Sequence, residues 1–276
     1  MRIAPMSLAD LDRVLDWAAD EGWNPGLDDA AAFHAADPDG FLMGWVGDEP
    51  VAAISVVRHN PSYGFLGLFI TRPEWRGQGV GGKLWQAGMD HLGDRIVGLD
   101  GVLAQQGNYA RAGFALAHRT IRFAASAPPD PWPPARRVEP RMLPDLVGLD
   151  TFVSGEERAD YLGAWFTDTP TRRTLALVDS GEITGVGTIR ACREGYKVGP
   201  LIAPKVAEAA SLLRALAAAI GTRSVLIDMP EANPAALAMA EHLGFKPMFE
   251  TARMYKGAPP LGKPAAIFGE TTLELG

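Results

Sequence analysis

The stretch from Phe65 to Leu92 limits most narrowly what this chain can fold into. An apolar run of strand-forming residues (65–70) is followed by Pro73, by a basic, glycine-dense segment (76–82) and then by apolar residues at helical spacing. This order predicts a strand, a glycine-rich loop and a helix. Such a loop leaves backbone N–H groups free at the positive end of a helix dipole, and glycine lets an anion approach that backbone closely. The segment therefore predicts a cradle for a pyrophosphate group.

The spacing of these glycines excludes one common phosphate-binding loop and argues against another. A Walker loop ends in Gly-Lys-Ser or Gly-Lys-Thr, whereas Leu84 follows Lys83 in this chain. The dinucleotide fingerprint Gly-x-Gly-x-x-Gly is formally present in Gly77, Gly79 and Gly82. It follows a candidate fourth strand, however, and a dinucleotide loop follows the first strand of its βαβ unit. The match to that fingerprint is therefore weak.

Two further patterns resemble those of one enzyme family. The pattern Arg76-x-x-Gly79-x-Gly81, placed between a strand and a helix, resembles the acyl-CoA loop of the GNAT superfamily of N-acetyltransferases. In that superfamily a tyrosine four residues before a Gly-Phe pair often lies beside the CoA sulfur, and the segment 109–114, Tyr-Ala-Arg-Ala-Gly-Phe, is similar. The alternative interpretation of the loop is a glycine-rich turn that binds no ligand.

Length and composition bound the remaining possibilities. At 276 residues the chain is long enough for two domains, and 47% hydrophobic with 21% charged residues is typical of a soluble globular protein. No apolar run approaches the ~20 residues of a spanning helix, and the N-terminus lacks the apolar core of a signal peptide. The single cysteine, Cys192, fits a reducing compartment, so we expect a cytoplasmic protein with no membrane partner. A net charge of −7 argues against nucleic acid as a partner and weakly favours a cationic acceptor, and the spacing of Cys and His predicts no metal site.

A proline-rich segment, 125–135, separates two halves of similar length. Because such a segment should be semi-extended, it predicts a linker between a domain at 1–124 and a domain at 136–276. In the first half we expect strands at 2–4, 40–47, 51–58, 65–70, 95–100 and 114–123, and helices at 8–19, 28–36, 82–92 and 108–112. In the second half we expect strands at 174–179, 183–192, 195–202 and 224–229, and helices at 206–220 and 234–243. These patterns indicate the α/β class, with a mixed (α+β), mostly antiparallel sheet flanked by helices in each half.

The order of elements is the same in both halves, which indicates two tandem copies of one domain. The segments 195–201, 230–233 and 250–255 resemble the C-terminal domain of a bacterial subgroup of tandem GNAT proteins. This resemblance implies a two-domain GNAT protein with GNAT-like folds in both halves.

The two copies differ in the residues that would do chemistry. The second half has no glycine between Gly199 and Gly221, so it lacks a pyrophosphate cradle. Ala240 stands at the offset where the first half has Tyr109. We therefore expect a degenerate second domain and a catalytic first domain.

The resemblance implies an acetyl-CoA-dependent N-acetyltransferase in which the amine attacks the thioester directly in a ternary complex. The strand would hold the pantetheine arm and supply the oxyanion donor, the loop amides would bind the pyrophosphate, and Tyr109 would be the general acid. The expected CoA-binding residues are Leu68, Phe69, Ile70, Arg76, Gly77, Gln78, Gly79, Val80, Gly81, Gly82, Lys83, Asn108 and Arg111. The general base stays open, with Glu21, Asp48, His59 and His118 as candidates.

Three hypotheses about function remain at this point. The first is transfer of an acetyl group to the amine of a small molecule or to a protein amino group. The second keeps the fold but uses another acyl-CoA or a non-amine acceptor. The third is a CoA-binding sensor or interaction protein without turnover. The sequence also leaves open whether the protein is a monomer or a homodimer.

Overall fold

The first half of the chain forms the elements that its periodicity predicts. In this computed structural model, which describes residues 1–132 and 134–276, its strands are β1 Arg2–Pro5, β2 Phe41–Val46, β3 Glu49–Arg58, β4 Tyr63–Thr71, β5 Ile96–Val102 and β6 Ala115–Ser126. Its helices are α1 Leu8–Asp20, α2 Asp29–Ala36, α3 Val80–Leu92 and α4 Gln106–Arg111. Ser7 begins α1 because its hydroxyl accepts from the N–H of Asp10 at 3.2 Å while the Asp10 carboxylate accepts from the N–H of Ser7 at 3.1 Å.

The second half repeats this pattern and adds elements that the sequence did not reveal. Its strands are β7 Ala135–Arg137, β8 Arg172–Asp179, β9 Glu182–Ala191, β10 Tyr196–Ile202, β11 Ser224–Pro230, β12 Lys246–Lys256 and β13 Ile267–Gly269. Its helices are α5 Leu143–Ser154, α6 Ala159–Trp165, α7 Val206–Ile220 and α8 Pro234–His242. Helix α7 has the predicted bounds, and Asn233 caps α8 as expected by accepting from the N–H groups of Ala235 and Ala236. Pro133, inside the predicted linker, lies outside the described residues.

The two halves share one sheet, because a strand of each half pairs with strands of the other half. Across the described residues the strand order is β1-β2-β3-β4-β5-β12-β6-β11-β10-β9-β8-β7, and β13 pairs with β10. Strand β12 of the second half lies between β5 and β6 of the first half, and β6 pairs with β11 of the second half. All pairings are antiparallel except β4 with β5 and β10 with β11. This confirms the mixed α/β class and shows that the two domains cannot separate without breaking backbone hydrogen bonds.

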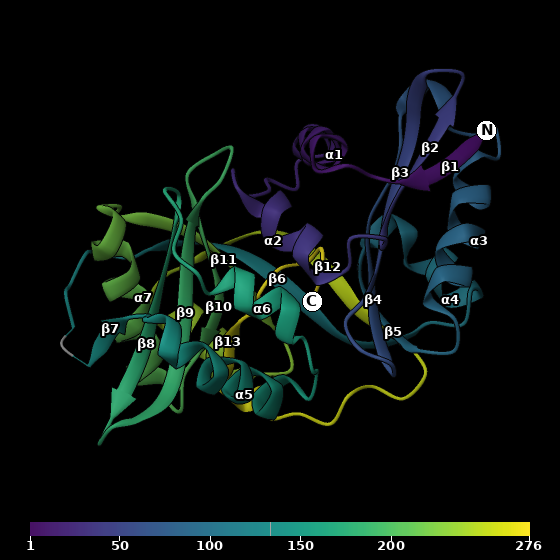
Figure 1. Cartoon of the computed structure of the whole chain (residues 1–276). Helices are drawn as coiled ribbons and strands as arrows, with labels where there is room; N and C mark the ends of the chain where they lie inside the picture. The colour runs from purple at the N-terminus through teal and green to yellow at the C-terminus, as the bar shows by residue number, and fades with distance from the viewer. Residues whose placement is uncertain (133) are drawn as a thin grey trace.

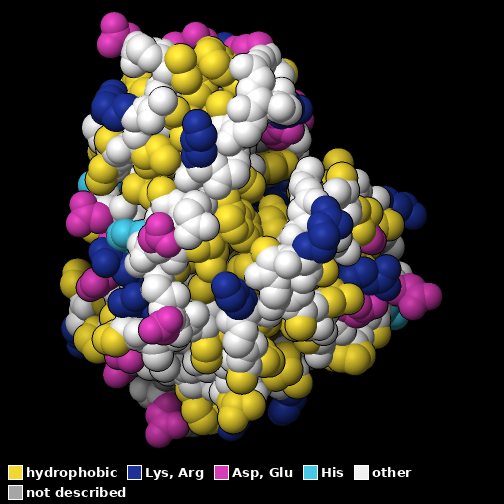
Figure 2. All heavy atoms as spheres, turned by 90° about the vertical axis from the view of Figure 1, so that its right-hand side faces the viewer, with side chains coloured by type: hydrophobic (Ala, Val, Ile, Leu, Met, Phe, Trp, Pro, Cys, Tyr) yellow, Lys and Arg dark blue, Asp and Glu magenta, His cyan; other side chains and the backbone are white. Residues whose placement is uncertain are grey.

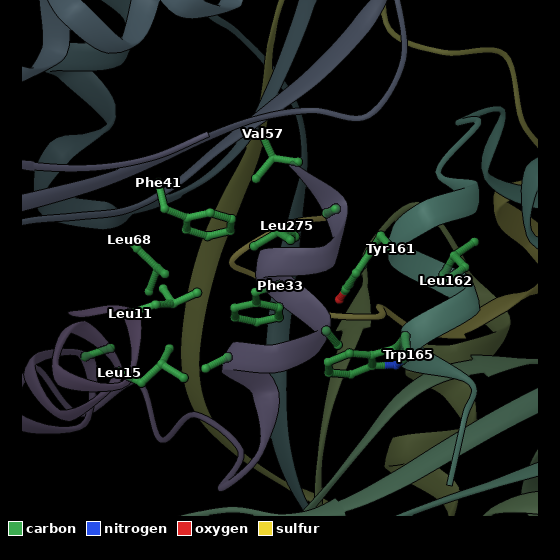
Figure 3. Close-up of a cluster of buried hydrophobic side chains, with 14 of the residues drawn as sticks. Leu11, Leu15, Phe33, Phe41, Val57, Leu68, Tyr161, Leu162, Trp165 and Leu275 are labelled. Atoms are coloured by element: carbon green, nitrogen blue, oxygen red, sulfur yellow. The ribbon is translucent and has the colours of Figure 1, made fainter. Parts of the chain in front are cut away.

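A hydrophobic cluster also joins the halves where the sheet bends. Helices α1 and α2 lie between the two arms of the sheet, and the C-terminus lies close to them (Figure 1). The ring of Phe33 on α2 stacks on Trp165 of α6 with centroids 6.0 Å apart, and Leu275 lies in the same cluster (Figure 3). All three side chains are fully buried, which contributes about 1.5–3 kcal/mol each to folding. The core near the C-terminus is therefore built from both halves at once.

Candidate active site

Strands β4 and β5 are paired for only part of their length. Their parallel register runs from Tyr63 opposite Ile96 to Leu66 opposite Leu99. Beyond this point the register of β4 with β3 also shifts, and Leu68 has a φ of 44°, a left-handed backbone that a bulky residue adopts only at an irregularity such as a bulge. The two strands diverge there around a cavity of about 520 Å³. The edge of β4 beyond Leu66 can therefore offer its backbone groups to an extended ligand in this cavity.

The glycine-rich loop forms the wall of an adjoining cavity, also of about 520 Å³. Gly77 and Gly79 both have a φ of 76°, and Gly79 is the N-cap residue immediately before α3. Because the first N–H groups of a helix have no carbonyl of their own helix to bind, the N–H groups of Val80 to Gly82 point toward the loop. The loop therefore has the free donors and the left-handed glycines of an anion cradle.

The two cavities form one groove. They share Phe69, Thr71, Arg76, Gln105 and Tyr109 in their linings. The face of the molecule that carries α3 and α4 is hollowed near its centre, with hydrophobic side chains in the hollow and basic side chains beside it (Figure 2). A long ligand with an anionic end and a less polar arm fits a groove of this kind.

The structure brings most of the sequence-predicted binding residues to this groove. Leu68, Phe69, Ile70 and Arg76 line the first cavity, and Arg76, Gly77, Gly79, Val80, Gly81, Gly82 and Asn108 line the second. Three others are not part of either lining. Gln78 donates from its side-chain nitrogen to the Glu74 carbonyl at 2.8 Å, Lys83 is exposed on α3, and Arg111 donates to the Asn108 side chain. For Gln78 the backbone N–H stays the predicted phosphate donor, whereas the Lys83 N–H donates to the Gly79 carbonyl at 3.4 Å and is not free for a ligand.

Tyr109 lines both cavities at the point where they meet. Its ring packs against Trp85 and Phe114, with centroids 5.9 and 6.3 Å away, and lies over Gly101, where a side chain would collide with it. Burial raises the pKa of Tyr109 to about 12. The hydroxyl therefore carries its proton at neutral pH and can donate a hydrogen bond to an atom in the groove.

Of the base candidates, only Glu21 lies in the groove. It lines the first cavity and accepts a hydrogen bond from the guanidinium of Arg76. Asp48 is exposed at the turn between β2 and β3. His118 lines a different cavity, with its Nε2 3.7 Å from Glu270.

His59, the remaining candidate, lies under the C-terminal residues. Its Nε2 is 2.9 Å from the Leu275 carbonyl, and its ring stacks on Tyr63 with centroids 5.8 Å apart. Burial, with the nearby charge of Arg158, lowers the pKa of His59 to about 3. The ring is therefore neutral in the folded protein and is part of the packing between the halves.

This lowered pKa predicts a pH-dependent effect of the substitution His59→Phe. The unfolded chain binds a proton at His59 below pH ~6.5, whereas the folded chain does not until about pH 3, so acidification destabilises the wild type through this residue. When the pH is lowered from 7 to 5, the free energy of unfolding of the phenylalanine variant should therefore rise by about 2 kcal/mol relative to that of wild type. Urea unfolding of both chains at the two pH values measures this difference. A constant difference would show that His59 titrates normally in the fold.

Sequence reasoning missed several residues that line the first cavity. Asp100 of β5 accepts from Arg253 at 2.8 and 3.1 Å, and burial raises its pKa to about 6 although Arg253 opposes this. Arg122, Phe249 and Glu274 also line this cavity. Arg122 lies on β6, at the end of the first half, and Phe249 and Glu274 come from β12 and the C-terminal segment, which reach the first half only through the strand exchange. No motif marks them, because their position depends on tertiary pairing alone.

The corresponding groove of the second half is filled by the chain itself. Strands β10 and β11 are parallel at only two residue pairs, and β13 pairs with β10 beyond them. The N–H of Glu270 donates to the Asp228 carbonyl at 2.8 Å, and a side chain at Gly199 would collide with the Glu270 and Thr271 carbonyls. Helix α7 begins after Lys205, without glycine. This half therefore has neither the open edge nor the glycine loop of the first half.

Among residues 1–132 and 134–276, no helix combines the length and apolar character needed to cross a membrane. In the same residues, no group of three or more His, Cys, Asp or Glu side chains is arranged to hold a metal ion.

Comparison with known sequences gives matches in both halves. Residues 8–115 match the model of the Acetyltransferase (GNAT) family, and residues 146–269 match that of the Acetyltransferase (GNAT) domain. A holothin acyltransferase from Pseudoalteromonas sp. (strain SANK 73390) is 33% identical over 276 residues, which are 99% of this chain and 93% of that protein.

Solved structures resemble the whole chain. A candidate acetyltransferase from Pyrococcus horikoshii superposes with a TM-score of 0.82 and 21% identity, covering 100% of this chain and 95% of its own. A tandem GNAT protein from the clavulanic acid biosynthesis pathway has a TM-score of 0.59 and 15% identity, covering 93% and 99% of the two chains. At these identities the likeness shows a shared fold.

Proposed function

This chain belongs to the GNAT family of acyltransferases in its tandem form, and from that premise we propose that it transfers an acetyl group from acetyl-CoA to a primary amine. The observation that carries this proposal is the groove of the first half, in which the open edge of β4, the glycine loop and Tyr109 meet. We assign catalysis to the first domain, 1–124, because the second-half groove is occupied by β13. The domain at 136–276 then supplies walls of the site.

Each part of the groove has one task in this reaction. The N–H groups of 78–82 and the guanidinium of Arg76 bind the pyrophosphate, since both present donors to an anion, whereas the Lys83 N–H is used by the Gly79 carbonyl. The β4 backbone at 68–70 binds the pantetheine arm, and a backbone N–H there donates to the thioester oxygen as negative charge develops on it.

Bond changes then follow in a fixed order. The neutral amine attacks the carbonyl carbon, the C–S bond breaks, and the departing sulfur takes a proton from the Tyr109 hydroxyl. The proton that the new amide nitrogen loses restores the tyrosine. Because the pKa of Tyr109 is about 12, its hydroxyl stays protonated in the resting enzyme. Loss of this proton to the sulfur is therefore coupled to the uptake of a proton from the amide nitrogen.

The relative from Pseudoalteromonas carries the name of an acyltransferase that acts on holothin. Holothin therefore belongs in the panel of acceptors, beside amines, amino acids, polyamines, aminoglycosides and peptides. Longer acyl-CoA donors belong beside acetyl-CoA.

The substitution Tyr109→Phe tests the assignment of the acid. It should lower turnover by about ten-fold or more and leave CoA affinity nearly unchanged, because only the hydroxyl is removed and the ring packing stays. The measurement is CoA-thiol release with each donor and acceptor, with CoA affinity determined separately. An equal loss of affinity would make Tyr109 a binding residue, and tight acetyl-CoA binding without release for any acceptor would favour another donor or a sensor.

A further inference from the structure

The C-terminal segment of the second half reaches into the first-half cavity. Leu273 and Glu274 line it together with residues of β4 and Tyr109. The Glu274 carbonyl oxygen lies directly against Gly67, where any side chain would collide with it. Gly67 precedes Leu68, the residue of left-handed backbone at which β4 leaves β5. Glu274 therefore lies opposite the part of β4 that holds the reacting group in the proposed function.

This segment is anchored after Glu274 by Leu275 and before it by Thr272, whose hydroxyl is 3.2 Å from the Tyr161 hydroxyl. The Leu275 side chain is fully buried in the cluster that contains Phe33 and Phe41 (Figure 3). The Leu275 N–H donates to the Thr272 hydroxyl at 3.1 Å, and its carbonyl oxygen is 2.9 Å from His59 Nε2. A carboxylate between such anchors has its position fixed before a ligand arrives.

Glu274 differs from the other carboxylates of this cavity, because its Oε2 has no partner among the described residues. Glu21 is bonded to Arg76, and Asp100 accepts twice from Arg253 Nε and once from its Nη2. Glu274 is only 4% exposed, and its Oε2 has no hydrogen-bond partner within the part of the chain that the structure describes. An unpaired buried acceptor is costly unless a ligand supplies a donor.

Glu274 interacts electrostatically with three buried cations, Arg122, Arg190 and Lys197. Burial lowers the pKa of Arg122, but Asp228 and then Glu274 raise it above its ordinary value. Burial opposes the charge of Arg190, but Asp29 and, with a smaller effect, Glu274 hold its pKa above the ordinary value. Burial lowers the pKa of Lys197, and Glu274 is among the charges that oppose this. Their positive charges offset the cost of burying an anion at this position.

Aromatic side chains complete this end of the cavity. Trp23, after α1, and Phe249, on β12, line it with Glu274. The guanidinium of Arg122 lies 5.4 Å from the centroid of Phe249, and its Nη1 donates to the Trp23 carbonyl at 2.9 Å. These contacts hold both walls in place. Aromatic side chains in a cavity lining favour a flat apolar group packed against them.

We propose that this end of the cavity is the acceptor subsite, and that Glu274 of the second domain binds the nitrogen of a primary amine carried on a flat apolar group. The proposal rests on the proposed function of the groove. It assigns to the second domain a task beyond scaffolding: its C-terminal segment supplies the residue that recognises the acceptor.

Calorimetry on the full chain saturated with CoA tests this site without turnover. The probes are tryptamine and tryptophol, which share an indole ring and differ in an ammonium against a hydroxyl group. Wild type should bind tryptamine at least about ten-fold more tightly, because a charge-assisted hydrogen bond to a buried carboxylate is stronger than a neutral one. Glu274→Gln should bind both probes equally and keep its CoA affinity. Glu250→Gln, the same change on β12 outside the cavity, should keep the preference of the wild type.

Other results would overturn the inference. These are equal binding of the two probes by wild type, an undiminished preference in Glu274→Gln, or a parallel loss of CoA affinity in that variant. The thiol-release assay separates this inference from the proposed function. If the chain prefers tryptamine but releases no thiol, the amine subsite is supported and the transferase function is contradicted. If the chain transfers the acyl group but Glu274→Gln still prefers tryptamine, the transferase function is supported and the role of Glu274 is contradicted.

Discussion

Replacing Asp29 by alanine should lower the free energy of unfolding by about 3–5 kcal/mol. Asp29 of α2 is fully buried and accepts from Arg172 Nη2 at 2.9 Å, from Arg190 Nε at 3.2 Å and from the Gly26 N–H at 2.8 Å. Burial raises the pKa of Asp29, but Arg190 and Arg172 outweigh it and hold the pKa below its ordinary value. The alanine variant leaves two buried guanidinium groups of the second half without this counter-charge, and both lie over the ring of Trp165.

Urea unfolding of Asp29→Ala measures this loss, and Asp16→Ala is the matched control. Asp16 also pairs with an arginine of the other half, Arg193, but its side chain is 62% exposed. An exposed pair contributes about 0–1 kcal/mol, so the control should be nearly as stable as wild type. If Asp29→Ala lowered the free energy of unfolding by less than about 1 kcal/mol, the ion pairs of Asp29 with Arg172 and Arg190 would not be what holds α2 against β8 and β9.

The sequence predicted the local elements well and their pairing only in part. The glycines after β4, the Ser7 cap and the apolar spacing of 206–220 are local signals, and the structure has a helix or strand at each of them. Strand β12 has no such signal for its neighbours. Strands β6 and β12 both follow a Gly-Phe pair, at 113–114 and 244–245. The local sequence is therefore equally compatible with pairing inside its own half and with the observed pairing to strands of the other half. The exchange is decided by packing across the two cores, which no periodicity encodes.

The same reason explains which part of the candidate site could be found from the sequence. The loop residues and Tyr109 occur within 46 residues of Leu68 and carry spacing patterns, and they line one groove. Glu274, by contrast, lies near the end of the sequence in a short acidic segment that resembles a solvated tail. It reaches the groove because β13 and the buried Leu275 direct the chain there.

The substitution Gly79→Phe should reduce CoA affinity at least about hundred-fold. Gly79 lines the second cavity at the start of α3, and the space that its side chain would enter contains no protein atom within 4 Å. A phenyl ring there fills the cradle and removes at least two charge-assisted hydrogen bonds of about 1.5–3 kcal/mol each. Gly221→Phe is the matched control, because Gly221 has a φ of 72° against 76° for Gly79, also faces open space, and ends α7 in the second half. Both substitutions should cost about 1–2 kcal/mol of stability through backbone strain, so only the effect on CoA separates them. Calorimetric titration with CoA measures that effect, and tight binding by Gly79→Phe would show that the pyrophosphate lies elsewhere.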